Sequence, residues 1–239
     1  MSVCSFESIN DLTLESAKKS LRTYCQNGES GLTQYDNYYR TYRETAKADI
    51  RLLALLELVR YGGWNMNRNG QCAHIINEIK IGSITLNELE RFWEVVDTLP
   101  NITLRDLPNT SREDIKQIEL SFDVIRKKLR GWHPSADSLC FLTKVILMFN
   151  WGQAPAFDTR IREVLKVRNN LTSKDLIIAL TEIGTWIRNF ESKYGVRLDK
   201  LATEEMYMHA NMKLLSPLPL GRSFDMLVYF NNGKLKGSN

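Results

Sequence analysis

The chain has 239 residues, of which 43% are hydrophobic and 25% are charged, and this balance excludes disorder over most of the length. Against 28 Asp and Glu there are 32 Lys and Arg, so the formal charge is only +4. Such a weak excess permits a polyanionic partner without requiring one. Every apolar run is shorter than the roughly 20 residues that a membrane-spanning helix needs, so we expect no membrane segment.

Helical periodicity dominates the sequence, and helix start and stop signals divide it into segments. The expected helices cover about 11–25, 33–61, 72–79, 85–98, 112–130, 136–149, 158–167, 173–194 and 202–214. Their boundaries rest on capping boxes such as Thr85 with Glu88, and on stop signals such as Gly195. A C-terminal apolar run, FDMLVYF, predicts either one short strand or a segment that packs on the core.

These elements predict an all-α fold, with one multi-helix globular domain over residues 1–239. The alternative is two lobes, about 30–130 and 131–215, with the N-terminal helix in addition. We expect the tail after about Asn231 to be mobile, because chain ends that nothing ties down are poorly ordered. The sequence indicates no oligomeric state.

The cysteines and histidines are too scattered to predict a metal site. Four cysteines and three histidines occur, without a CxxC pair or the spacing of a zinc or iron–sulfur site. We therefore expect no metal and no cofactor. The first residues, MSVCSFESINDL, lack the basic start and apolar run of a secretion signal. Together with dispersed cysteines, this favours a cytoplasmic protein with reduced thiols.

The stretch CFLTKVILMFNWGQAPAFDTRIREVL, residues 140–165, joins an apolar helix to a second helix through a short turn. A lysine lies in the apolar helix, an aspartate begins the second helix, and a basic residue follows one turn later. This stretch resembles the helix–turn–Asp portion of the 8-oxoguanine DNA glycosylase fold, in the helix-hairpin-helix glycosylase superfamily. It looks more closely like a bacterial group with this fold that includes phage-defence proteins. The matching positions are Thr143, Lys144, Pro155, Ala156, Phe157, Asp158 and Arg162.

The resemblance implies an enzyme, a DNA glycosylase that excises a modified or damaged base, in one version as an antiviral defence. Such an enzyme flips a nucleotide of double-stranded DNA into a pocket. Two departures favour a non-catalytic nucleic-acid-binding or protein-interaction module that keeps the same fold. Gly131-Trp132-His133-Pro134 replaces the family's Gly-x-Gly hairpin, and no lysine stands where bifunctional members carry their catalytic lysine. A helical interaction protein unrelated to glycosylases is the third hypothesis.

Asp158 and Lys144 are the candidate catalytic residues, and each has a structural alternative. A carboxylate beside the sugar C1′ would stabilise the positive charge that develops during bond cleavage and could orient a water. An Asp at a helix start is also a common N-cap. Lys144, within an apolar helix, either extends to the surface along its stem or lies in a pocket as an attacking amine.

The candidate DNA-binding residues are basic and lie near helix ends. They are Arg126, Lys127, Lys128, Arg130, Arg160 and Arg162. Phosphate contacts would use them, but a solvated helix face or the dipole at a helix C-terminus explains them equally well. The candidate base-pocket residues are Trp132, His133, Trp64 and Asn65. Their rings could stack on an extruded base and their amides could read its edge; packing on the core and ordinary loop chemistry are the alternatives.

Overall fold

The computed structural model describes residues 2–27, 47–53, 71–99, 103–132, 142–143, 146, 154–168, 170–209 and 218–230. Within these residues every regular element is a helix, so the fold is all-α, as the sequence predicts. The elements are α1 (Leu14–Asn27), α4 (Gln71–Lys80), α5 (Leu86–Asp97), η1 (Leu107–Asn109), α6 (Arg112–Trp132), α8 (Thr159–Leu165), α9 (Ser173–Tyr194), α10 (Leu198–His209) and α11 (Leu220–Tyr229). None of the helices in this described part is both long and apolar enough to cross a membrane.

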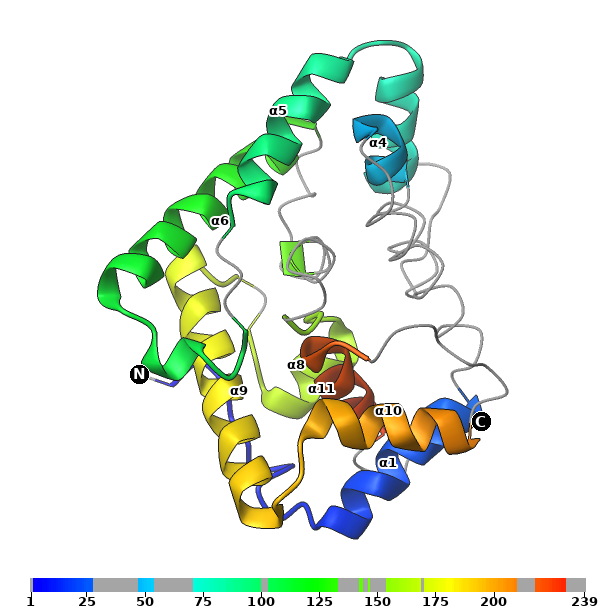
Figure 1. Cartoon of the computed structure of the whole chain (residues 1–239). Helices are drawn as coiled ribbons and strands as arrows, with labels where there is room; N and C mark the ends of the chain where they lie inside the picture. Colours follow the sequence, from blue (N-terminus) through cyan, green and yellow to red (C-terminus); the bar gives the residue numbers. More distant parts are fainter. Residues whose placement is uncertain are drawn as a thin grey trace.

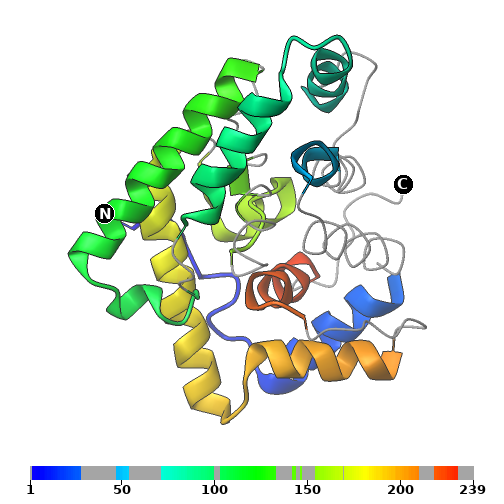
Figure 2. The same ribbon diagram turned by 45° about the horizontal axis from the view of Figure 1, so that its top comes forward.

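The long helix α9 connects two groups of helices (Figures 1 and 2). At one end α5 and α6 lie side by side, and α6 packs on α9, where Ser173 Oγ donates a 2.5 Å hydrogen bond to Asp123. At the other end α1, α10 and α11 pack on one another, and α8 packs on α11. The buried apolar side chains form one cluster that includes residues from both groups. Helix α9 therefore holds the α5–α6 pair and the group around α11 in one fold.

A close approach of two backbones fixes η1 against the middle of α9. A Cβ atom built on Gly184 of α9 would lie 1.9 Å from the carbonyl oxygen of Leu104 and 3.2 Å from Pro108 Cδ. Real Cβ atoms essentially never come that near a backbone atom, so only glycine fits here. The segment before α6 thus lies directly on the backbone of α9.

The capping signals act as the sequence predicts. Thr85 and Glu88 form a capping box at α5, with both reciprocal hydrogen bonds present. Thr172 and Asp175 form a second box at the start of α9. Gly195 ends α9 in the left-handed conformation, with φ +66°, which costs glycine nothing. These local signals place α9 at the predicted residues.

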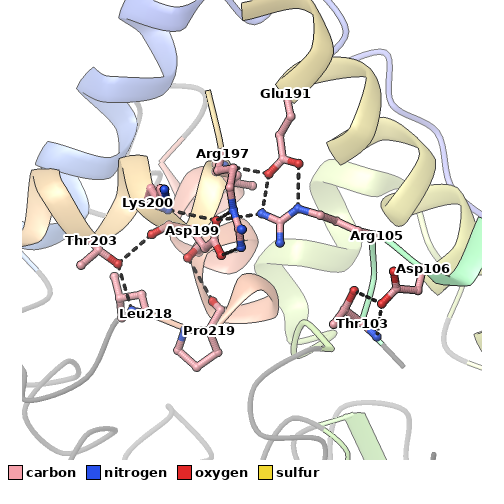
Figure 3. A network of polar contacts seen from close by, with 12 residues as sticks. Thr103, Arg105, Asp106, Glu191, Arg197, Asp199, Lys200, Thr203, Leu218 and Pro219 are labelled. Carbon is pink, nitrogen blue, oxygen red and sulfur yellow. Dashed lines mark hydrogen bonds and ion pairs between the residues drawn. The ribbon is translucent and has the colours of Figure 1, made fainter. Parts of the chain in front are cut away.

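A network of charged side chains joins α9 to α10 (Figure 3). Arg105 donates to both carboxylate oxygens of Glu191, at 2.7 and 2.6 Å, and to Asp199 Oδ1 at 2.7 Å. Arg197 donates to the other oxygen of Asp199 at 2.7 Å. The backbone N–H of Leu198, the first residue of α10, donates to Glu191 at 2.8 Å. We call Arg105, Glu191, Arg197 and Asp199 the α9–α10 joint.

The N-terminal segment is tied to α9 and α8. The backbone amides of Val3 and Cys4 donate to the Glu182 carboxylate, at 2.8 Å for Cys4, and Ser5 N–H donates to the Leu165 carbonyl at 2.8 Å. Cys4 is a buried free thiol, and burial raises its pKa. The segment before α1 is therefore held by hydrogen bonds along its backbone.

Two predicted elements are corrected by the structure. The C-terminal run FDMLVYF is not a strand; it belongs to α11, and it packs on the core as the second alternative stated. The run, six apolar residues and one Asp, carries no usable period, whereas a helix satisfies its own backbone groups in a segment buried between α1, α8 and α10. Helix α10 begins at Leu198 rather than near 202, because Glu191 from α9 binds its first amide.

Several expected segments lie largely outside the described residues. Of the helix expected over 33–61, the structure describes 47–53, and 48–53 are helical. Of the one expected over 136–149, it describes Leu142, Thr143 and Ile146, all helical. The tail after Asn231 lies outside the described part entirely.

Candidate functional site

Asp158 is the N-cap of α8. Its backbone is extended (φ −70°, ψ 176°), its Oδ1 accepts a 3.0 Å hydrogen bond from the Ile161 N–H, and its carbonyl accepts from the Arg162 N–H at 3.0 Å. The side chain is half-buried. Among the described residues, Oδ2 has no hydrogen-bond partner. One carboxylate oxygen therefore caps the helix, and the second is available to bind another group.

The 154–158 turn, which leads into α8, is held by two buried side chains. The Ala156 N–H donates to both oxygens of Asp225, at 3.1 and 3.2 Å. The Phe157 N–H donates to Thr143 Oγ1 at 2.8 Å, and the Asp158 N–H closes a tight turn onto the Ala156 carbonyl at 2.9 Å. Every backbone N–H from 156 to 158 is thus satisfied, which a buried turn requires. The direction in which Asp158 begins α8 is set by these bonds.

Asp225 belongs to a polar cluster between α1 and α11. Its side chain is 6% exposed and lies 3.9 Å from Arg222, one turn earlier on α11. Arg222 donates a short hydrogen bond to the Tyr24 hydroxyl and lies over the Tyr24 ring, 5.0 Å from its centroid. Burial raises the pKa of Tyr24, and the nearby guanidinium offsets only part of this rise. The phenol therefore stays neutral while it accepts from Arg222.

The two arginines of the first turn of α8 make different contacts. Arg160 Nε donates to the carbonyl of Tyr229, at the end of α11, at 3.1 Å. Arg162 Nη2 lies 3.4 Å from Thr159 Oγ1, while its buried Nε has no hydrogen-bond partner in the described part of the chain. Both are half-buried. Both arginines thus lie in the first turn after Asp158, and within the described residues neither forms an ion pair with its carboxylate.

The basic cluster at the end of α6 is not brought to this site. Lys127 and Arg130 are exposed, Arg126 and Lys128 are half-buried, and the helix buries its opposite side. Figures 1 and 2 show α6 beside α5 and apart from α8. These four residues lie on α6, away from the start of α8.

Of the predicted base-pocket residues, only Trp132 lies in the described part. It ends α6, is half-buried, and packs on Phe92 with ring centroids 4.8 Å apart. This contact is the core packing that the sequence left as an alternative. His133, Trp64 and Asn65 lie outside the described residues, as does the second catalytic candidate, Lys144.

Sequence reasoning did not single out Asp225 or Arg222. The available signal was a carboxylate inside the apolar run FDMLVYF, because Asp is almost never fully buried without a partner. Which group it would meet could not be read from the sequence, since Ala156 is 69 residues away. Thr143 was included only as a position matching the resemblance.

Within the residues that the structure describes, no three His, Cys, Asp or Glu side chains gather as they would around a metal ion. The described site therefore consists of a carboxylate, its two flanking arginines and the polar residues that hold the turn. Compared with protein-family models, with curated proteins and with solved structures, the chain matches none.

Proposed function

We propose that this protein is a DNA glycosylase that removes a modified or damaged base, and that Asp158 is the carboxylate that stabilises the cationic sugar. The observation that carries the proposal is the state of this side chain. It is half-buried, oriented through one oxygen by the Ile161 amide, and without a partner at the other oxygen among the described residues. A preorientated charge of this kind stabilises a developing cation without reorganising during the reaction.

The surroundings of Asp158 support this role. Arg162, four residues further on, is half-buried, and a guanidinium in the first turn after the carboxylate is the kind of group that contacts a phosphate. The amides of residues 156–158 are all satisfied, so the backbone that carries the carboxylate is held in place. The resemblance of residues 140–165 to bacterial glycosylase-fold proteins supplies the reaction class, and phage defence is the version it suggests.

A non-catalytic scaffold that binds nucleic acid or protein is the second candidate. Its supporting observation is that Asp158 and Arg160 each have a structural task, the first as a helix cap and the second as a donor to the Tyr229 carbonyl. A helix cap alone is worth roughly 0.5–2 kcal/mol and would justify an Asp at this position. The two candidates differ in whether a glycosidic bond is broken.

The test is base release from DNA. Duplexes carrying oxidised, deaminated, alkylated or glucosylated bases, together with phage DNA, are incubated with the protein, and abasic sites are counted. Asp158→Asn should lower release at least about 100-fold, the usual loss when an electrostatic contact to the transition state is removed. Asn is an N-cap as good as Asp, so the variant should remain within about 1–2 kcal/mol of the wild-type stability.

Asp106→Asn is the matched control, because it makes the same chemical change in a turn away from α8, where Asp106 accepts from Thr103. It should release bases at the wild-type rate. Wild-type rates from Asp158→Asn would rule out Asp158 as the catalytic group. Salt-dependent DNA binding by a wild-type protein that releases no base would identify the scaffold instead. Borohydride trapping of a covalent adduct would assign an attacking amine such as Lys144.

A further inference from the structure

Helix α11 holds the start of α8 at two points. Before the helix, the Asp225 carboxylate accepts the Ala156 N–H with both oxygens. Within its first turn, Arg160 donates to the Tyr229 carbonyl. Asp158 lies between these two ties. Any shift of α11 relative to α8 would therefore move the backbone that carries Asp158.

Asp225 is itself anchored to the core of the molecule. It is 4% exposed, and α11 packs on both α1 and α10. Arg222, its partner on the same helix, contacts Tyr24 of α1 through a hydrogen bond and through the face of the ring. The helix that carries this carboxylate is thus held against α1 and α10.

A buried carboxylate is a hydrogen-bond acceptor with a high desolvation cost, which a purely structural contact does not need. Burying a carboxylate has a large desolvation cost, and a buried ion pair is commonly no more stabilising than apolar residues of the same size. The neighbouring amide, that of Phe157, is satisfied by the neutral hydroxyl of Thr143. What a carboxylate adds is a second acceptor oxygen, so that the Ala156 N–H is shared between two oxygens of one side chain.

We propose that Asp225 is a positioning residue for Asp158: its bonds to the Ala156 amide set the direction from which the candidate catalytic carboxylate is presented. This inference rests on the proposed glycosylase function. It predicts that loss of the Asp225 carboxylate slows bond cleavage while DNA binding is retained, because a displacement of about 1 Å in a reacting group can cost about 100-fold in rate.

Glu205→Gln offers a matched control. Glu205 is also a buried carboxylate, 2% exposed, and it is paired with Arg22 and His209, each at 3.3 Å. In the described part of the chain it has no hydrogen bond to the 154–158 turn. Its substitution therefore removes a buried charge from the same group of helices without touching the start of α8.

The experiment compares wild type, Asp225→Asn, Asp225→Ala and Glu205→Gln on the duplex or phage DNA from which wild type releases a base. Single-turnover rates at saturating protein, dissociation constants for the same DNA and thermal unfolding are measured for each. We expect Asp225→Asn to lower the rate about 10-fold and Asp225→Ala about 100-fold, with unchanged DNA affinity. The Asn carbonyl can still accept the Ala156 N–H, which explains the partial rescue. Glu205→Gln should lose stability but keep the rate.

If Asp225→Ala fails to fold, Asp225→Asn and Glu205→Gln decide the question alone. Wild-type rates from Asp225→Asn, alongside an inactive Asp158→Asn, would overturn the positioning role and leave the glycosylase function standing. Equal slowing by Glu205→Gln would also overturn it, because general loosening would then explain the loss. If wild type releases no base from any of the DNA samples, the proposed function fails and the positioning role fails with it.

Discussion

Two networks in the described part of the chain are built from the same kinds of side chain, carboxylates and arginines, and they bind different groups. In the α9–α10 joint (Arg105, Glu191, Arg197 and Asp199), charges are satisfied mainly by other charges, and the network ties three segments together (Figure 3). In the polar cluster between α1 and α11 (Tyr24, Arg222 and Asp225; the α11 cluster below), Asp225 instead directs both oxygens to the backbone amide of Ala156. The types of side chain in a network therefore do not reveal whether it supports a functional site. The backbone groups that the network binds do reveal this.

This difference separates a structural role from a functional one. The joint closes around the start of α10. Among the described residues, the backbone amides that it binds are those of Leu198, the first residue of α10, and Lys200. The α11 cluster binds the amide of Ala156, two residues before Asp158. The Asp158 Oδ2 atom has no hydrogen-bond partner among the described residues. We therefore expect damage near the joint to lower stability alone, and damage to the α11 cluster to lower catalysis as well.

The largest expected effect comes from Gly184→Ala, which disturbs the packing under the joint without changing a charge. The added methyl would meet the Leu104 carbonyl at 1.9 Å, so the backbone at Leu104, just before η1, must move away from α9. Overpacking of this kind costs roughly 1–3 kcal/mol and more where backbone must shift, and we expect about 3 kcal/mol or more here. Urea unfolding measures the loss.

Gly131→Ala is the control for that change. Gly131 lies in the last turn of α6 and has no positive φ, and among the described residues no atom lies within 4 Å of an added Cβ. Replacing glycine by alanine inside a helix should stabilise the protein by about 0.5–1 kcal/mol. At a temperature where both variants are folded, both should release bases at the wild-type rate. A Gly184→Ala protein that is stable but slow would break the distinction between the two networks.

The sequence predicts this fold best where the signals are local. Helix α9 lies at its predicted residues because the Thr172–Asp175 capping box and Gly195 are part of the segment itself. The start of α10 was missed because Leu198 is capped by Glu191, a side chain from another helix. The strand alternative for the run in α11 was wrong because burial on all sides removes the periodicity that separates helix from strand.

The candidate site follows the same rule. That Asp158 begins a helix was predictable, since Asp followed by a helical segment is a local capping signal, and the structure places it there. Its support by Asp225 was not predictable, because the contact joins residues 69 positions apart and depends on how α11 packs. The separation of the α6 basic residues from α8 is likewise a property of the tertiary fold. Whether the chain forms one domain or two lobes stays a prediction.

A medium effect is expected from Asp199→Asn in the joint. Burial alone would raise the pKa of Asp199, but the hydrogen bonds and charges of Arg197 and Arg105 outweigh it and hold the pKa below its ordinary value of 3.8. An acid with a depressed folded-state pKa adds stability above the unfolded pKa and loses it as the pH falls through the folded pKa. Asp199→Asn should therefore cost about 1–3 kcal/mol at pH 7.

The pH dependence distinguishes this charge effect from simple loss of packing. As the pH falls below about 4, wild type should lose stability and its unfolding free energy should approach that of Asp199→Asn. Unfolding in urea at several pH values between 7 and 3 measures the two curves. Curves that stay parallel would show that the carboxylate charge contributes little to the joint. Base release measured on the folded variant at pH 7 should remain at the wild-type rate.

The smallest effect is expected from Glu7→Gln, at an ion pair on the surface. Lys166 donates to Glu7 at 2.5 Å, and this hydrogen bond lowers the pKa of Glu7. The two side chains are 59% and 73% exposed, so water screens the pair, and ordering two long side chains opposes what attraction remains. Glu7→Gln should leave the unfolding temperature unchanged within error at pH 7. A loss of stability as large as that of Asp199→Asn would mean that solvent exposure does not explain why the surface pair is weaker than the joint. The contrast between the two networks would then depend on Asp225 alone.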